Sequence, residues 1–84
     1  MAIWMNVFIE AKEGKGGELA QSYAERCPDI RKEPGCNQFE FYQSIERPDL
    51  FILHEEWADE AALDTHRLLT QQQGVDTSHL RKGT

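Results

Sequence analysis

Three stretches of the chain alternate apolar and polar side chains with the period of two that is typical of β-strands. They cover residues 3–11, 36–45 and 50–57. The intervening residues 46–49 read ERPD, a composition that favours a tight turn. The second and third strands are therefore predicted to form a hairpin.

Two further stretches have the periodicity of helices. In the first, over residues 18–32, apolar side chains recur along one face, at Leu19, Tyr23, Cys27 and Ile30. Pro28 is expected to kink this helix, and the Pro34-Gly35 pair to end it. The glycine-rich residues 12–17 match neither common phosphate-binding motif, so they are predicted to be a flexible connection.

The second helix is predicted over residues 60–70, because Asp59 is a favourable N-cap residue. One of its faces carries Ala62, His66 and Leu69. The resulting order β-α-β-β-α is that of an α+β, ferredoxin-like sandwich short of one strand. Because nothing after Gly74 alternates, the last strand is predicted to be missing.

The first strand is apolar on both of its faces. One face carries Ile3, Met5, Val7 and Ile9, and the other carries Trp4, Asn6, Phe8 and Glu10. Two helices can cover only one face of a sheet. The sequence therefore predicts a homodimer in which two sheets pack face to face.

Length and composition limit the remaining possibilities. The 84 residues predict a single domain over residues 1–84, with a core over about 3–70 and a polar tail over 71–84. The net charge of −6, without a basic stripe, argues against nucleic acid and anionic membranes as partners. No apolar run is long enough to span a membrane, and no signal peptide is recognisable.

A cytoplasmic location is therefore expected, with Cys27 and Cys36 reduced and a disulfide between them the less favoured alternative. Metal ligands in proteins usually come in closely spaced Cys and His pairs. The three histidines, His54, His66 and His79, are widely separated in the sequence. No metal site is predicted.

Several short motifs occur together at specific spacings. Residues 33–36 read EPGC, residues 54–57 HEEW and residues 60–63 EAAL, followed by His66. The first strand ends in KEG, and the first helix carries its late proline in YAERCP. Between about Val7 and His66, the chain resembles the antibiotic biosynthesis monooxygenase (ABM) family of the dimeric α+β barrel superfamily. The resemblance implies a dimeric α+β barrel.

The family includes cofactor-independent oxygenases of quinols and polyketide anthrones, haem-degrading enzymes and signal-molecule isomerases. The resemblance thus implies a monooxygenase that uses no cofactor and acts on a small electron-rich aromatic, such as a quinol or anthrone. The first alternative is a non-catalytic, dimeric ligand-binding or interaction domain. A weaker alternative is a haem-binding or haem-degrading relative.

The resemblance also implies candidate site residues. His66 occupies the family's histidine position and is the expected base, since the unperturbed pKa of a histidine suits acid–base catalysis near neutral pH. Asn6 resembles a first-strand asparagine of the haem-degrading branch and is the expected hydrogen-bond donor. Trp57 is an expected pocket wall, and further substrate contacts are predicted at Trp4, Phe8, Tyr42 and His54. The alternative for Asn6, Trp57 and His66 is packing without chemistry, and for Tyr42 and His54 it is a solvated or interface pair.

The position of Asn6 has a consequence for the orientation of the first strand. If Asn6 follows its family counterpart, Trp4, Asn6 and Phe8 face the helices, while Ile3, Met5, Val7 and Ile9 face the partner subunit. The most useful single observation is whether a cavity lies between the sheet and the second helix and touches Asn6 and His66.

Some family residues have no counterpart here. Leu63 stands where the anthrone oxygenases have a tyrosine proton acceptor. His66 stands where haem degraders have a tryptophan, and their haem-ligating histidine falls nearest to Asp76, or to His79 after a shift. These departures favour the non-catalytic alternative and argue against haem.

Overall fold

The computed structural model describes residues 2–74 and 77–83. Its elements are β1 (Ile3–Ala11), α1 (Gly16–Ile30), β2 (Cys36–Gln43), β3 (Leu50–Trp57), α2 (Glu60–Gln73), the 3₁₀-helix η1 (Ser78–Leu80) and β4 (Arg81–Gly83). The predicted β-α-β-β-α order is confirmed. Among the described residues, no helix is long and apolar enough to cross a membrane.

The strands form one antiparallel sheet in the order β2-β3-β1-β4, which confirms the ferredoxin-like α+β fold. The prediction of a missing last strand is wrong, because β4 pairs with β1 through Ala11 and Arg81. Three residues are too short to show a period of two. The segment is held instead by the buried Leu80 and by a 2.8 Å hydrogen bond from Arg81 Nη2 to the Tyr23 hydroxyl.

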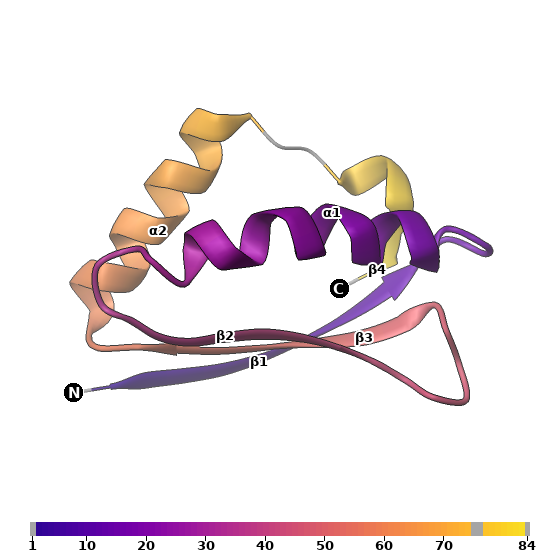
Figure 1. The fold of residues 1–84 in the computed structure, drawn as a ribbon, viewed down its shortest axis with the longest axis horizontal. Coiled ribbons are helices and arrows are strands. Elements are labelled where there is room, and N and C mark those ends of the chain that lie inside the picture. The colour runs from indigo at the N-terminus through magenta and orange to yellow at the C-terminus, as the bar shows by residue number, and fades with distance from the viewer. Residues whose placement is uncertain (1, 75–76, 84) are drawn as a thin grey trace.

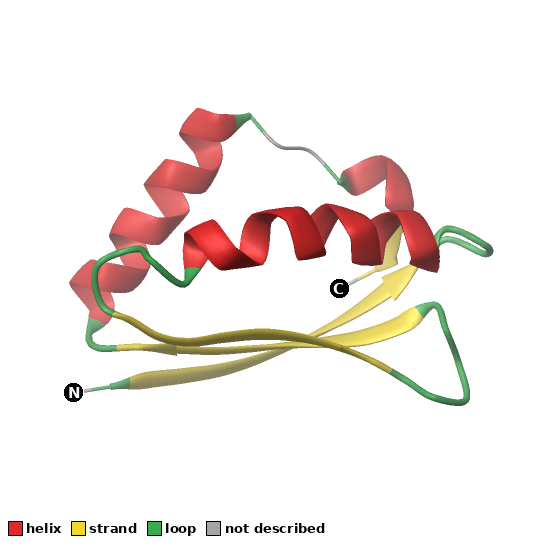
Figure 2. Cartoon of the chain, in the orientation of Figure 1, coloured by secondary structure: helices red, strands yellow, loops and turns green. Residues whose placement is uncertain are grey.

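Both helices lie on the same side of the sheet (Figure 1), and the other side carries no helix (Figure 2). Ile9 and Ala11 of β1 are buried beneath the helices, and Ile3, Met5 and Val7 pack against the same core. We call this covered side the inner face and the opposite side the outer face.

The orientation predicted for β1 is therefore wrong. Trp4, Asn6 and Phe8 point to the outer face and are exposed in the single chain. Because β1 is apolar on both sides, its pattern alone did not decide which side the helices cover. The aliphatic side is the one that meets the apolar stripe of α1.

The core lies between the inner face and α1. The predicted stripe is confirmed, since each of its four residues is buried: Leu19, Tyr23, Cys27 and Ile30. The Tyr23 ring stacks on Phe41 with 4.0 Å between ring centroids, and Phe41 stacks on Phe51 at 4.6 Å. These contacts fix α1 along the sheet and determine where the loop that follows it emerges.

α1 begins at Gly16, two residues earlier than predicted. The reason is a contact from the β2–β3 hairpin, where the Asp49 carboxylate accepts hydrogen bonds from the Gly16 and Gly14 backbone N–H groups at 3.0 and 3.2 Å. A carboxylate at this position satisfies helix-end donors that otherwise lack partners. The hairpin thereby anchors the start of α1.

Cys27 and Cys36 are both free thiols. Burial raises the pKa of each thiol. The nucleophilic thiolate form is therefore disfavoured at neutral pH.

Candidate functional site

His66 lies in the middle of α2, on the side of the helix that faces the sheet. The helix begins as predicted, with the Asp59 carboxylate accepting a 2.8 Å hydrogen bond from the Ala62 backbone N–H. It extends to Gln73, three residues beyond the prediction, and Gly74 ends it in the left-handed conformation with φ +67°. This placement directs the imidazole of His66 toward the turn between α1 and β2.

That turn carries Glu33 and is pressed against α2. Gly35 has φ +80°, and the Ala58 backbone N–H donates a 2.8 Å hydrogen bond to the Gly35 carbonyl oxygen. A Cβ atom at position 35 would lie only 2.5 Å from the Cβ of Ala62. The close approach requires a glycine here and brings Glu33 next to His66.

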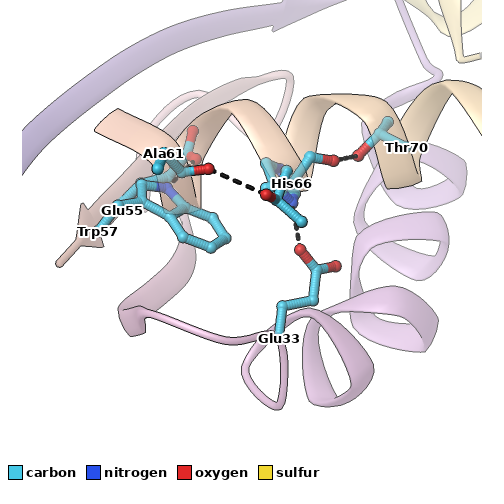
Figure 3. Close-up of polar contacts among 7 residues, drawn as sticks. Glu33, Glu55, Trp57, Ala61, His66 and Thr70 are labelled. Atoms are coloured by element: carbon cyan, nitrogen blue, oxygen red, sulfur yellow. Dashed lines mark hydrogen bonds and ion pairs between the residues drawn. The ribbon is translucent and has the colours of Figure 1, made fainter. Parts of the chain in front are cut away.

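The central contact of the site joins His66 Nδ1 to Glu33 Oε1 at 2.8 Å (Figure 3). Only 12% of the His66 side chain and 11% of the Glu33 side chain are exposed. A carboxylate only accepts hydrogen bonds, so Nδ1 must donate its proton to Glu33. In a neutral imidazole this leaves Nε2 as the nitrogen that can accept a proton.

Aromatic rings hold the imidazole from two sides. Trp57, at the end of β3, is fully buried and stacks on the His66 ring with 4.6 Å between centroids and 28° between planes. Phe39 of β2 meets the same ring edge-on at 5.7 Å. The indole N–H of Trp57 in turn donates a 2.9 Å hydrogen bond to Glu55. The inner-face site therefore consists of Glu33, Phe39, Glu55, Trp57 and His66.

Replacing Gly35 by alanine should disturb this arrangement. A left-handed backbone at a non-glycine residue costs about 1–3 kcal/mol, and the Ala62 methyl group has no rotamer by which to move away. Urea unfolding should therefore show a larger loss of stability for Gly35→Ala than for Gly14→Ala, the matched control. Gly14 has φ +78° but open space around it. Equal losses in the two variants would contradict the proposed close contact.

The outer face brings together the other predicted residues. His54 Nδ1 lies 2.6 Å from Asn6 Oδ1, across the pairing of β1 with β3. The Trp4 ring lies 5.3 Å from the His54 ring. Because an amide oxygen accepts, His54 Nδ1 donates here. Phe8 and Tyr42 lie on the same face, each opposite Ile52 in the register of the sheet.

A cavity of about 530 Å³ opens at the hairpin end of the sheet. Its lining residues include Phe8, Tyr42, Arg47, Leu50 and Ile52. The cavity touches neither Asn6 nor His66.

Asn6 and His66 lie on opposite faces of the sheet, so no single pocket joins them. The structure brings His66 and Trp57 together on the inner face. It groups the remaining candidates on the outer face: Trp4, Asn6, Phe8, Tyr42 and His54. Sequence reasoning missed the roles of Glu33 and Glu55. For Glu55 a signal exists, because it alternates with the apolar residues Phe51, Leu53 and Trp57.

The haem ligands considered from the sequence do not form a set. His79 is exposed on η1, and Asp76 lies outside the described residues. Within residues 2–74 and 77–83, no three Cys, His, Asp or Glu side chains are grouped so that they could hold a metal ion.

The fold and the site together define a ferredoxin-like α+β domain with a histidine–carboxylate pair beneath its second helix. A model of the antibiotic biosynthesis monooxygenase family matches residues 2–74. The chain belongs to this family, and the resemblance seen in the sequence is confirmed.

Individual relatives agree with this assignment. The chain is 36% identical over 61 residues to the protein sll1783 of Synechocystis sp., an alignment that covers 69% of this chain but 40% of the relative's length. It is 26% identical over 72 residues to the Bacillus subtilis (strain 168) protein named "Putative monooxygenase YcnE", covering 86% and 76% of the two chains.

The crystal structure of PA3566 from Pseudomonas aeruginosa superposes with a TM-score of 0.85 over 95% of this chain and 83% of that chain. At 24% identity this likeness supports the fold alone.

Proposed function

We propose that the protein is an ABM-type monooxygenase, free of metal and flavin, that acts on a small electron-rich aromatic such as a quinol or polyketide anthrone. The observation that carries the proposal is the 2.8 Å contact between His66 and Glu33, both of them largely buried. Family membership and the name of the Bacillus subtilis relative support the same class of reaction.

In this reaction the substrate itself reduces dioxygen. His66 Nε2 removes a proton from the substrate, and the resulting anion passes its electrons to dioxygen. For an anthrone, the CH₂ group becomes a carbonyl, one oxygen atom of O₂ enters the product, and the other leaves as water. The demands on the protein are a positioned base and stabilisation of the charge that develops on it.

Two neighbours of His66 in the inner-face site have a role in this scheme. Glu33 keeps the proton of His66 on Nδ1, orients the ring, and stabilises the imidazolium that forms when Nε2 accepts a proton. Trp57, which is fully buried, holds the imidazole in place by stacking against its face. Asn6 is assigned no part in this site, since it points to the outer face.

The proposal is tested by oxygen consumption with a panel of quinols and anthrones, using ¹⁸O₂ and mass spectrometry of the product. The expected result is catalysed uptake with one ¹⁸O atom incorporated per product molecule. Uptake no faster than the uncatalysed background across the panel would contradict the enzyme proposal. It would leave the non-catalytic dimeric domain as the function to pursue.

We also propose that a second copy of the chain covers the outer face. Trp4 and Phe8 are 61% and 69% exposed in the single chain and lie on one sheet face with Tyr42. Exposed aromatic clusters of this kind mark contact surfaces. Two such faces packed together would form the dimeric α+β barrel and fill the cavity at the hairpin end with side chains.

Replacing Phe8 by glutamate should therefore convert the dimer to a monomer, because association would bury an unpaired charge. The control is Leu68→Glu on α2, which changes an apolar residue that is 59% exposed and lies away from the outer face. Light scattering coupled to gel filtration should report a dimer for wild type and Leu68→Glu, and a monomer for Phe8→Glu. A monomeric wild-type protein at micromolar concentration would refute the dimer.

A further inference from the structure

Glu55 is a buried carboxylate, 5% exposed. Among the described residues, its side chain has one hydrogen-bond donor, the Trp57 indole N–H at 2.9 Å. In the described part of the chain, no lysine or arginine forms an ion pair with it. Burying an ionised carboxylate is unfavourable unless a nearby charge or several donors compensate for the lost hydration.

One side chain, Trp57, separates Glu55 from His66. Glu55 contacts the edge of the Trp57 indole, and the face of the same indole stacks on His66 at 4.6 Å. Glu33 lies against His66 Nδ1 at 2.8 Å. Within the inner-face site, four groups therefore follow one another in the order Glu55–Trp57–His66–Glu33, with a carboxylate at each end (Figure 3).

A second observation shows that the Glu33 and Glu55 carboxylates both act on the Cys36 thiol. The pKa of the Cys36 thiol is raised first by burial and then by the negative charges of Glu33 and Glu55. Arg31 opposes this effect, but its guanidinium is engaged with Glu40 at 3.1 Å and with the Phe39 carbonyl oxygen at 2.9 Å. Glu33 and Glu55 thus both lie close enough to the Cys36 thiol to act on it, and the Arg31 guanidinium is directed toward β2.

We propose that Glu55 is a positioning residue that acts through Trp57. It holds the indole against His66, and with Glu33 it stabilises the imidazolium form of that histidine. A hydrogen bond from the indole N–H to a carboxylate also increases the electron density of the ring face, which strengthens its attraction for a cation. The coupling of Glu55 to His66 is inferred from the contacts described above. Its consequence for catalysis rests on the proposed function.

The coupling is tested by titrating the three histidines by NMR, with the His66 signal assigned from its absence in His66→Asn. In Glu55→Gln the titration midpoint of His66 should fall by about 0.5–1 pH unit, a three- to tenfold loss of proton affinity, because a nearby negative charge is removed. The matched control is Glu56→Gln, which neutralises the next residue on the outer face. It should leave the His66 midpoint unchanged.

A double-mutant cycle tests the part played by Trp57. In Trp57→Phe, Glu55 loses its hydrogen-bond donor and with it the link to His66, so the His66 midpoint should fall as it does in Glu55→Gln. Adding Glu55→Gln to Trp57→Phe should then change nothing more. An unchanged midpoint in either single variant, or full additivity in the double variant, would overturn the proposal. If Glu55→Gln fails to fold, an unchanged His66 midpoint in Trp57→Phe still overturns the proposal.

Activity is a separate readout. Where wild type oxygenates a substrate, Glu55→Gln should lower kcat three- to tenfold with little change in KM, and Glu56→Gln should not. If wild type shows no oxygenase activity, the monooxygenase proposal fails, while the NMR titration still decides whether Glu55 acts on His66. The two failures are therefore distinguishable.

Discussion

Replacing His66 by asparagine should lower kcat for quinol or anthrone oxygenation by about 10²–10⁴-fold, the usual contribution of a positioned general base. The asparagine amide N–H₂ can still donate to Glu33 from near the position of Nδ1, so the partner carboxylate remains satisfied. What is lost is Nε2, the nitrogen that accepts the substrate proton. The loss should therefore appear in kcat, measured by initial rates of oxygen uptake, with KM little affected.

His79→Asn is the matched control, because His79 is exposed on η1 and outside the inner-face site. It should retain wild-type rates. Glu33→Gln should lie between the two variants, since a glutamine can accept from Nδ1 but carries no charge to stabilise the imidazolium. If His66→Asn retained the wild-type kcat while remaining folded, His66 would have no part in the mechanism.

Much of the fold was predictable because the sequence patterns of its helices and strands involve residues close together in the chain. The apolar stripe of α1, the alternation of β3 and the cap at Asp59 each depend on residues a few positions apart. The side of β1 that the helices cover was not predictable in this way. That choice depends on how the whole chain packs, and β1 carries apolar residues on both sides. β4 escaped prediction because three residues carry no periodicity.

Of the pair His66 and Glu33, only His66 was predictable from the sequence. His66 stood out because it lies on the apolar side of a predicted helix and at a recurrent family position. Its partner Glu33 lies 33 residues earlier in the chain, and the contact exists because the Gly35 turn presses against α2. Such a pairing follows from tertiary packing, which no local spacing encodes. Asn6 was misplaced for the same reason as β1, since its direction follows the orientation of the strand.

Replacing Trp57 by alanine should be the most damaging single change to stability. Trp57 is the largest fully buried side chain, and its truncation should cost about 3–5 kcal/mol for lost contacts and the cavity left behind. The buried Glu55 would also lose its hydrogen-bond donor, which adds about 1–3 kcal/mol. Small domains have total stabilities of about 5–15 kcal/mol, so Trp57→Ala should be largely unfolded or unfold at low urea concentration. Urea titration followed by circular dichroism measures this directly.

Trp4→Ala is the informative contrast, because it removes the same side chain from the outer face, where the single chain leaves it exposed. Its intrinsic cost should stay within about 0.5 kcal/mol, as expected for a surface position. Any further cost should come from weakened association and should therefore depend on protein concentration. A loss below 1 kcal/mol for Trp57→Ala, or a concentration-independent loss of similar size for both variants, would contradict the assignment of the two tryptophans to opposite faces. The pair thus separates the residue that builds the core and holds His66 from the residue proposed to bind a second copy.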